Sequence, residues 1–312
     1  MQEITITESG ALSGTFTEDL PRRWIEFIDA KPKTVETYTR AIRQFMLYLS
    51  EHGIDQPHRE DILAYRDALR AEHRATTVQS YIAAVKQFFR WTEQEHLYPN
   101  IADHIKGARI DSGFKKDYLT SKQVGKLLQA IDRSTLKGLR NYAILALMVT
   151  TGLRTIEVVR ANIEDMRTVA DFTALYIQGK GRDEKSDFVK VEPPIEEAIR
   201  AYLAARGKNA ANEPLFASTS NRNGGGRMTT RSISRIAKEN LAGAELISDR
   251  LTAHSLRHTA ATLNLLNGGT PEETRQLLRH SNINTTLIYS HALERSKNNS
   301  EARITKAIFG KG

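Results

Sequence analysis

Four short segments of the sequence concentrate side chains that could act on a phosphodiester. They are TGLRTIE at 151–157, QGKGR at 178–182, HSLRH at 254–258 and LLRHSNINTTLIYSH at 277–291. A phosphate under attack gathers negative charge on its non-bridging oxygens, so catalysis depends largely on positioning and electrostatic stabilisation. Arginine is suited to this because its planar fork donates paired hydrogen bonds to phosphate oxygens. The segments therefore indicate phosphoryl transfer.

Two arginines stand where a helix could aim them at a phosphate. Arg154 follows Gly152, at which we expect a helix to end and the chain to turn sharply. Arg257 lies three residues after His254, so on a helix the two share a face. For an arginine taken alone, an ordinary solvated or ion-paired side chain is the better interpretation. The presence of both arginines in segments of this type favours phosphate binding.

The candidate nucleophile is Tyr289. A free tyrosine has a pKa of about 10, so it needs a base or a stabilised phenolate before it attacks. His254 is the expected base because histidine titrates near neutral pH, and two nearby arginines would favour the phenolate. The alternative is a packing tyrosine, which is the usual role of this residue type at helical spacing. Asn284 is expected to cap the short helix that carries Tyr289.

The leaving oxygen of a cleaved phosphodiester needs a proton, and Lys180 is the candidate general acid. Lys185 and Arg182 lie in the same turn, and a solvated loop lysine is the alternative interpretation. His280 is expected to hydrogen-bond the phosphate, whereas His258 is interpreted as structural; without the motif, both could be surface or helix-cap histidines. The sequence has no spaced acidic trio and no HExxH motif, so we expect neither a metal nor a cofactor.

Taken together, in order and at these separations, the four segments resemble the tyrosine recombinase or phage integrase family, the Xer and integrase group in particular. The resemblance covers the chain from Tyr118 to about Leu293. It implies a catalytic set of Arg154, Lys180, His254, Arg257, His280 and Tyr289, with Glu157 supporting the first arginine. It also implies a 3′-phosphotyrosine intermediate and exchange through a Holliday junction, by a homotetramer on two double-stranded DNA sites with inverted-repeat half-sites. The phosphotyrosine bond stores the energy of the broken phosphodiester, so no ATP is expected.

The elements that must position these residues fall into two expected domains in an Xer-like layout. Residues 1–17 are polar and irregular, and we expect them to be flexible. Residues 18–107 predict a helical core DNA-binding domain, with apolar positions at helical spacing in 34–50, 60–72 and 76–93. Residues 108–117 predict a linker, or alternatively a long surface loop.

Residues 118–312 predict the catalytic domain. Thr120 and Gln123 form a capping box, and a buried helix is expected over Asn141–Thr150. Residues 173–191 predict a β-hairpin with a polar turn, and the pattern is helical again from Pro194. The fold class is therefore mainly α with a small β-sheet: a helical core-binding domain plus a mixed α/β catalytic domain.

The last segment, about 295–312, predicts a tail with an apolar patch at Ile304, Ala307, Ile308 and Phe309. The patch is too small to form a stable helix alone, so it needs a partner surface. The tail either folds back on its own catalytic domain or docks on a neighbouring protomer. The family resemblance favours exchange between protomers.

Composition limits the classes of protein that fit. The 312 residues carry a formal net charge of +8 and a pI near 9.5, which favours a polyanionic partner, nucleic acid before an acidic membrane. No cysteine is present, which excludes disulfides, thiol catalysis and cysteine-bound zinc. There is neither a signal peptide nor a long apolar stretch in the sequence, so we expect a cytoplasmic protein.

Two rival functions remain open at this point. A type IB topoisomerase-like enzyme would use the same chemistry without strand exchange, but the separate helical domain and short length argue against it. A catalytically silent DNA-binding protein on the same fold is disfavoured by the complete catalytic set. The target sequence, and the choice between integration, excision, resolution and inversion, are not indicated.

Overall fold

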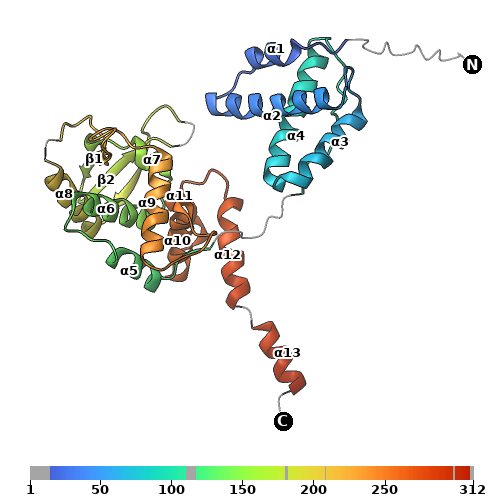
Figure 1. Cartoon of the computed structure of the whole chain (residues 1–312). Helices are drawn as coiled ribbons and strands as arrows, with labels where there is room; N and C mark the ends of the chain where they lie inside the picture. Colours follow the sequence, from blue (N-terminus) through green and yellow to red (C-terminus); the bar gives the residue numbers. More distant parts are fainter. Residues whose placement is uncertain (1–14, 110–116, 180–181, 208, 298, 310–312) are drawn as a thin grey trace, which may run out of the picture. The chain divides into compact units, whose positions relative to one another are not determined.

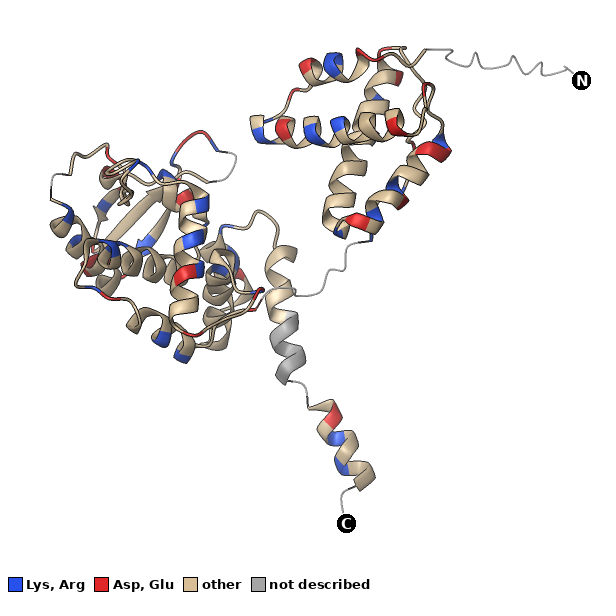
Figure 2. Cartoon of the chain, in the orientation of Figure 1, with Lys and Arg blue, Asp and Glu red and all other residues tan. Residues whose placement is uncertain are grey.

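The computed structural model describes residues 15–109, 117–179, 182–207, 209–297 and 299–309. The chain divides into two compact units (Figure 1), Met1–Ser112 and Gly113–Gly312, named here the helical unit and the mixed unit. Figure 2 shows that basic and acidic residues are interspersed along the ribbon of both units. None of the described helices is long and apolar enough to cross a membrane.

The helical unit is built around aromatic side chains at helical spacing. Its helices are α1 Leu20–Phe27, α2 Pro32–Glu51, α3 Arg59–Glu72 and α4 Ala75–Gln94. Helices α2 and α4 pack against each other, with α1 and α3 beside α4. Phe45, Phe88 and Phe89 are fully buried between them, and the rings of Phe88 and Phe89 meet edge to face at 5.1 Å. The three helices expected here are confirmed, with ends within two residues of the predicted ones.

The mixed unit holds the remaining elements. Its first half contains α5 Ser121–Gln129, α6 Leu136–Thr151, α7 Thr155–Arg160, the 3₁₀ turn η1 Ile163–Asp165, β1 Met166–Val169, β2 Phe172–Ile177 and β3 Asp187–Val191. Its second half contains α8 Pro193–Arg206, α9 Thr230–Gly243, α10 Ala253–Leu266, α11 Pro271–Leu278, α12 Asn284–Lys297 and α13 Ser300–Phe309. The fold is mainly α with a small sheet, as predicted.

The sheet is antiparallel, in the order β1-β2-β3. The expected hairpin is present as β2 and β3, in which Thr173 pairs with Val191 and Ile177 with Asp187. Strand β1 was not expected, because its middle residues are exposed and give no apolar alternation. Helix α6 lies at the centre of the unit and packs against α8, α10 and β3. Its side chains are buried almost all round, which explains why the sequence predicted a buried helix there.

Candidate active site

Arg154 is placed by the sharp turn between α6 and α7. Gly152 ends α6 with a φ of +63°, and a Cβ there would lie 2.6 Å from Leu278 Cδ2, so the predicted turn needs glycine. Arg154 is the N-cap residue of α7, and its backbone N–H donates to Glu157 Oε2 at 2.7 Å. Arg154 Nη1 donates to Glu157 Oε1 at 2.9 Å. The carboxylate thus fixes both the backbone and the side chain of the arginine.

Glu157 is fully buried and also binds Arg279, whose Nη2 lies 3.0 Å from Glu157 Oε2. Burial alone would raise the pKa of Glu157, but Arg279 and the hydrogen bonds from Arg154 outweigh it and hold the pKa below its usual value. The sequence analysis did not identify Arg279. This residue ends α11 in the left-handed conformation, with a φ of +54°, where glycine is common. Its basic side chain beside His280 was the one available signal.

Arg257 is the second arginine of the site and is only 2% exposed. Its Nη1 donates to the carbonyl oxygen of Gly152 and its Nη2 to that of Leu278. The guanidinium therefore links the end of α6 to the end of α11. Burial, together with the charges of Arg154 and Arg279, lowers the pKa of Arg257 to about 9, so it still carries its charge at neutral pH. As expected, Arg257 and His254 both lie on α10.

His280 follows the left-handed residue that ends α11. It is 9% exposed, and its Nδ1 lies 2.8 Å from the hydroxyl oxygen of Thr286. Burial and the positive charges of Arg257 and Arg154 lower the pKa of His280 to about 4. The imidazole is therefore neutral at neutral pH, which suits a hydrogen-bond donor to phosphate better than a proton carrier.

Tyr289 lies on α12 and is 5% exposed. Its ring packs with Ala261 and Leu278, and its hydroxyl oxygen lies 2.5 Å from His258 Nδ1. Burial raises the pKa of Tyr289 to about 12, although Arg257 and Arg154 oppose this rise. The phenol is therefore neutral at neutral pH and needs a proton acceptor before it can attack.

The surroundings of Tyr289 differ from the expected ones at His258 and at the start of α12. His258, which the sequence analysis interpreted as structural, hydrogen-bonds the tyrosine hydroxyl. The proposed base His254 packs edge-on against the ring of His258, at 4.6 Å between centroids. The start of α12 also differs, because the carboxamide oxygen of Asn282 accepts from the backbone N–H of Asn284 at 2.9 Å. Asn284 is the first residue of the helix rather than its cap.

The general acid proposed at Lys180 lies outside the described residues. The two alternatives in the same turn form ion pairs. Lys185 Nζ lies 2.5 Å from Oδ2 of the buried Asp165, and Arg182 Nη1 lies 3.2 Å from Asp187 Oδ2. The pair of Lys185 links the turn to η1, whereas the pair of Arg182 lies within the hairpin itself.

The structure therefore groups most of the predicted residues at one place in the mixed unit, where the start of α7 contacts the end of α11, which packs with α10 and α12. The grouped residues are Arg154, Glu157, His254, Arg257, His280 and Tyr289, joined by His258 and Arg279. Across the described ranges, no three His, Asp or Glu side chains are arranged to hold a metal ion. The arrangement places a buried phenol beside two guanidinium groups, which suits attack on a phosphate.

Models of known protein families match both units. Residues 117–295 match the phage integrase family, and residues 27–96 match the phage integrase N-terminal SAM-like domain. The tyrosine recombinase XerD of Listeria monocytogenes is 30% identical over 269 residues, which cover 83% of this chain and 87% of that protein. XerD of Oceanobacillus iheyensis is 28% identical over 270 residues, with the same coverage.

Solved structures share the fold. The XerH recombinase in a post-cleavage complex with a palindromic difH substrate has a TM-score of 0.69 at 20% identity, covering 88% of this chain and 78% of that one. A lambda integrase tetramer bound to a Holliday junction has a TM-score of 0.70 at 18% identity, covering 89% and 78%. At this identity the likeness concerns the fold alone.

Proposed function

The chain belongs to the phage integrase family and is a site-specific tyrosine recombinase acting on DNA, and we propose that Tyr289 is its nucleophile. In this proposal the Tyr289 oxygen attacks the scissile phosphorus and forms a 3′-phosphotyrosine bond, while the 5′ oxygen leaves. The observation that carries it is the placement of this one buried phenol within the field of Arg154 and Arg257. Attack by the freed 5′ hydroxyl of a partner strand would reverse the reaction and rejoin DNA.

The arginines supply the electrostatic part of this mechanism. The side chain of Arg154 is 29% exposed, so a phosphate can reach it, and Glu157 holds it in place. Arg257 has five N–H donors, of which one each goes to the carbonyls of Gly152 and Leu278. Two guanidinium groups on one phosphate would stabilise the charge that develops on its non-bridging oxygens.

The remaining roles concern protons and hydrogen bonds. Lys180 is proposed as the acid that protonates the leaving 5′ oxygen, and the ion pairs of Lys185 and Arg182 support this choice within the turn. Neutral His280 is proposed to donate from Nε2 to a phosphate oxygen, with its Nδ1 held by Thr286. His254, whose ring contacts that of His258, is the remaining member of the proposed catalytic residues.

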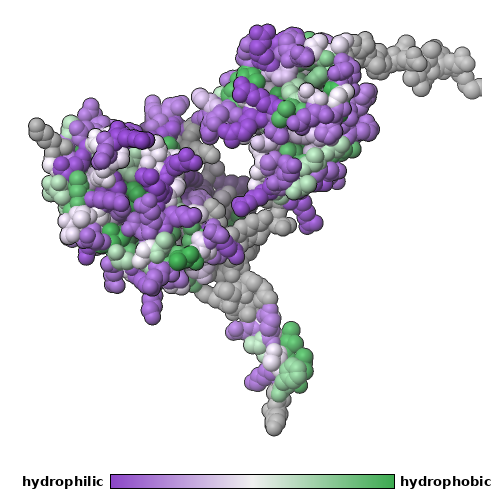
Figure 3. All heavy atoms as spheres, viewed as in Figure 1, coloured by the Kyte–Doolittle hydropathy of each residue, from purple (hydrophilic) through white to green (hydrophobic). Residues whose placement is uncertain are grey.

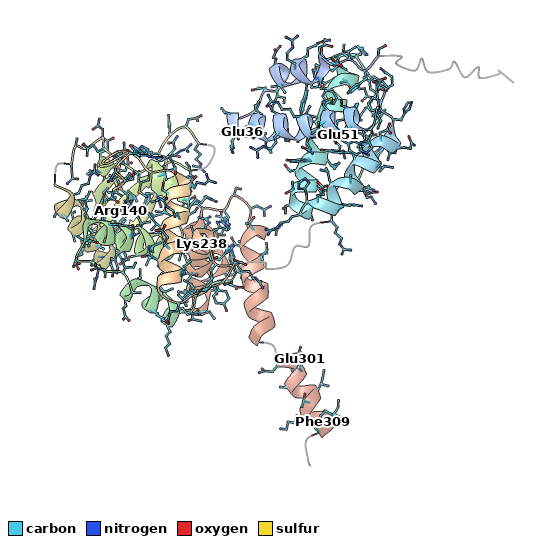
Figure 4. All side chains as sticks on the ribbon, viewed as in Figure 1. Glu36, Glu51, Arg140, Lys238, Glu301 and Phe309 are labelled. Atoms are coloured by element: carbon cyan, nitrogen blue, oxygen red, sulfur yellow. The ribbon has the colours of Figure 1, made fainter. Side chains whose placement is uncertain are left out.

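The DNA surface is proposed to include the region around α9. A hollow of about 490 Å³ lies there, with Glu239 as an acidic member of a lining rich in serine and threonine hydroxyls. Its basic members are Lys137, Arg140, Arg227 and Arg235. Figure 4 labels Arg140 on α6 and Lys238 on α9. Such a mixture of cations and hydroxyls is typical of contacts to the phosphate backbone.

The assembly proposed is a homotetramer on two DNA sites with inverted-repeat half-sites, acting through a Holliday junction. A neighbouring protomer also offers a partner for the tail. None of the described residues of α13 is buried, and Ile304, Ile308 and Phe309 are 58%, 65% and 76% exposed. Figure 3 shows apolar atoms along one side of this helix. This exposure favours docking on a neighbour over folding back. The cytoplasmic location expected from the sequence is part of the same proposal.

A plasmid with two copies of the target site tests the proposed function. A recombinase deletes or inverts the DNA between the sites, whereas a topoisomerase-like enzyme only relaxes supercoils. A silent binder does neither and leaves no covalent adduct on a nicked substrate that traps the cleaved state. Relaxation without any exchange of flanking DNA would contradict the recombinase proposal.

A further inference from the structure

We propose that His258, rather than His254, accepts the hydroxyl proton of Tyr289 during cleavage and is therefore a catalytic residue. This inference rests on the proposed function, because it concerns the proposed nucleophile. The sequence analysis expected Arg257 to bind the phosphate and interpreted the next residue, His258, as structural. The inference gives His258 a chemical role.

The geometry of α10 explains why His258 is the residue at the hydroxyl. His258, Ala261 and Leu265 follow each other at spacings of three and four, so they form one stripe along the helix. The ring of Tyr289 packs with Ala261 and Leu265 on this stripe. The ring therefore points its hydroxyl toward the next position of the same stripe, where His258 Nδ1 lies 2.5 Å from the phenol oxygen.

His254 occupies the following position of the stripe, one turn further from the apolar contact. Its ring meets the edge of the His258 ring at 4.6 Å, while the rings of His258 and Tyr289 are 5.3 Å apart. His254 is exposed, whereas His258 is half-buried between it and the phenol. The two histidines thus form a row from the surface to the nucleophile, and His258 is the member that contacts the reacting oxygen.

Charged and titratable side chains from several elements surround the row of His254 and His258. Arg257 lies on α10 itself, Arg154 and Glu157 lie at the start of α7, and Arg279 and His280 follow α11. Arg257 and Arg154 favour the phenolate, and burial opposes it. A preformed phenolate is therefore disfavoured in the absence of DNA, and proton loss is best coupled to the formation of the oxygen–phosphorus bond.

The proposed step balances as follows. The O–H bond of Tyr289 breaks, and its proton goes to Nδ1 of neutral His258, whose ring proton is on Nε2. The phenol oxygen forms a bond to the scissile phosphorus, and the bond from phosphorus to the 5′ oxygen breaks. The 5′ oxygen takes a proton from the general acid, proposed above as Lys180, and His258 is left as an imidazolium. The reverse step returns its proton to the tyrosine oxygen.

The test uses His258→Asn in the full-length chain, because the asparagine oxygen can stand near the place of Nδ1 but takes up no proton. His258→Gln serves as a second variant if the first does not fold. Single-turnover formation of the covalent adduct is measured on a nicked substrate that traps the cleaved state. A loss of about 100-fold or more is expected, the usual contribution of a general base, with unchanged DNA affinity. The rise of the wild-type rate as an imidazolium loses its proton should be absent from the variant.

A second substrate distinguishes the loss of the general base from the loss of the general acid. Sulfur in place of the bridging 5′ oxygen gives a thiolate leaving group, which needs no proton because thiol pKa values lie near 8.5. Lys180→Ala should recover cleavage on this substrate, and His258→Asn should not. Recovery of His258→Asn on the sulfur substrate, or cleavage of the natural one within about threefold of wild type, would overturn the role of His258.

Failure of the proposed function gives a different result. A wild-type chain that forms no adduct, or an adduct that persists after Tyr289→Phe, would overturn the nucleophile and this inference with it. A wild-type adduct through Tyr289 that His258→Asn does not diminish would overturn the inference alone.

Discussion

Replacing Glu157 with glutamine tests whether this buried carboxylate holds the arginines of the site. The side chain is fully buried and accepts from the backbone N–H of Arg154, from Arg154 Nη1 and from Arg279 Nη2. Glutamine keeps the shape, but it removes the negative charge and turns an NH₂ group toward other donors. Two guanidinium groups then lose the charge that balances them.

The size of the effect follows from the burial of the partners. Removing one partner of a buried ion pair costs about 3–5 kcal/mol in the free energy of unfolding. Water can partly solvate Arg154, whose side chain is 29% exposed, so the lower end of about 3 kcal/mol applies. For a unit of this length, 1 kcal/mol corresponds to about 2–4 °C, so the mixed unit should unfold roughly 6–12 °C lower.

The two tryptophans give an internal reference for this measurement. Trp24 and Trp91 both lie in the helical unit, so tryptophan fluorescence follows that unit, and calorimetry follows the whole chain. Glu157→Gln should lower the calorimetric transition of the mixed unit and leave the fluorescence transition in place. Glu239→Gln is the matched control, because it removes an exposed pair with Arg235 and should cost less than about 1 kcal/mol.

The pH dependence of stability gives an independent test of the contribution of Glu157. The folded pKa of Glu157 lies below its ordinary value of 4.5, so its contribution is complete above that pH and is lost as the pH falls through the folded pKa. The difference between wild type and Glu157→Gln should be largest at neutral pH and shrink below about pH 4.5. An unchanged transition of the mixed unit at pH 7 would refute the reasoning.

Three further predictions follow from the site. Arg154→Lys and Arg257→Lys keep the charge but lose the fork, so single-turnover cleavage should fall at least tenfold, about 1.4 kcal/mol. The pKa of His280 is lowered to about 4, so between about pH 6.5 and pH 4 only the unfolded chain takes up the proton. The free energy of unfolding of the wild type should therefore decrease as the pH falls through this range. His280→Gln should flatten this decline in urea unfolding measured at several pH values. Deleting residues 302–312 should spare binding of one protomer to a half-site but weaken cooperative binding to a full site in gel-shift titrations.

Each of these has a clear contrary result. Undiminished cleavage by both lysine variants would mean that neither arginine binds the transition state. An acid decline that persists unchanged in His280→Gln would assign it to other groups. Undiminished cooperativity and an unchanged balance of cleavage between protomers after truncation would refute docking of the tail on a neighbour.

Much of the fold could be predicted from local patterns in the sequence. Apolar spacing located the helices of the helical unit, and Gly152 located the end of α6, because both depend on residues close together in the chain. Strand β1 has only four residues and an exposed middle, so its pairing with β2 depends on packing rather than on its own pattern.

The site was partly predictable for the same reason. The motifs identified Arg154, Arg257 and Tyr289 by residue type and order. The contact between Glu157 and Arg279 joins positions 122 residues apart and requires a left-handed residue other than glycine, which no local pattern indicates. The choice of His258 over His254 depends on how α10 is turned toward α12, which is a property of tertiary packing.

Tyr289→Phe tests the central claim most directly. The phenylalanine ring keeps the packing with Ala261 and Leu278 and removes only the hydroxyl, so the fold and the affinity for DNA should stay close to those of the wild type. On a nicked substrate that traps the cleaved state, the wild-type chain should form a covalent adduct whose DNA-bearing peptide contains Tyr289, and the variant should form none. An adduct of undiminished yield in Tyr289→Phe would contradict the account.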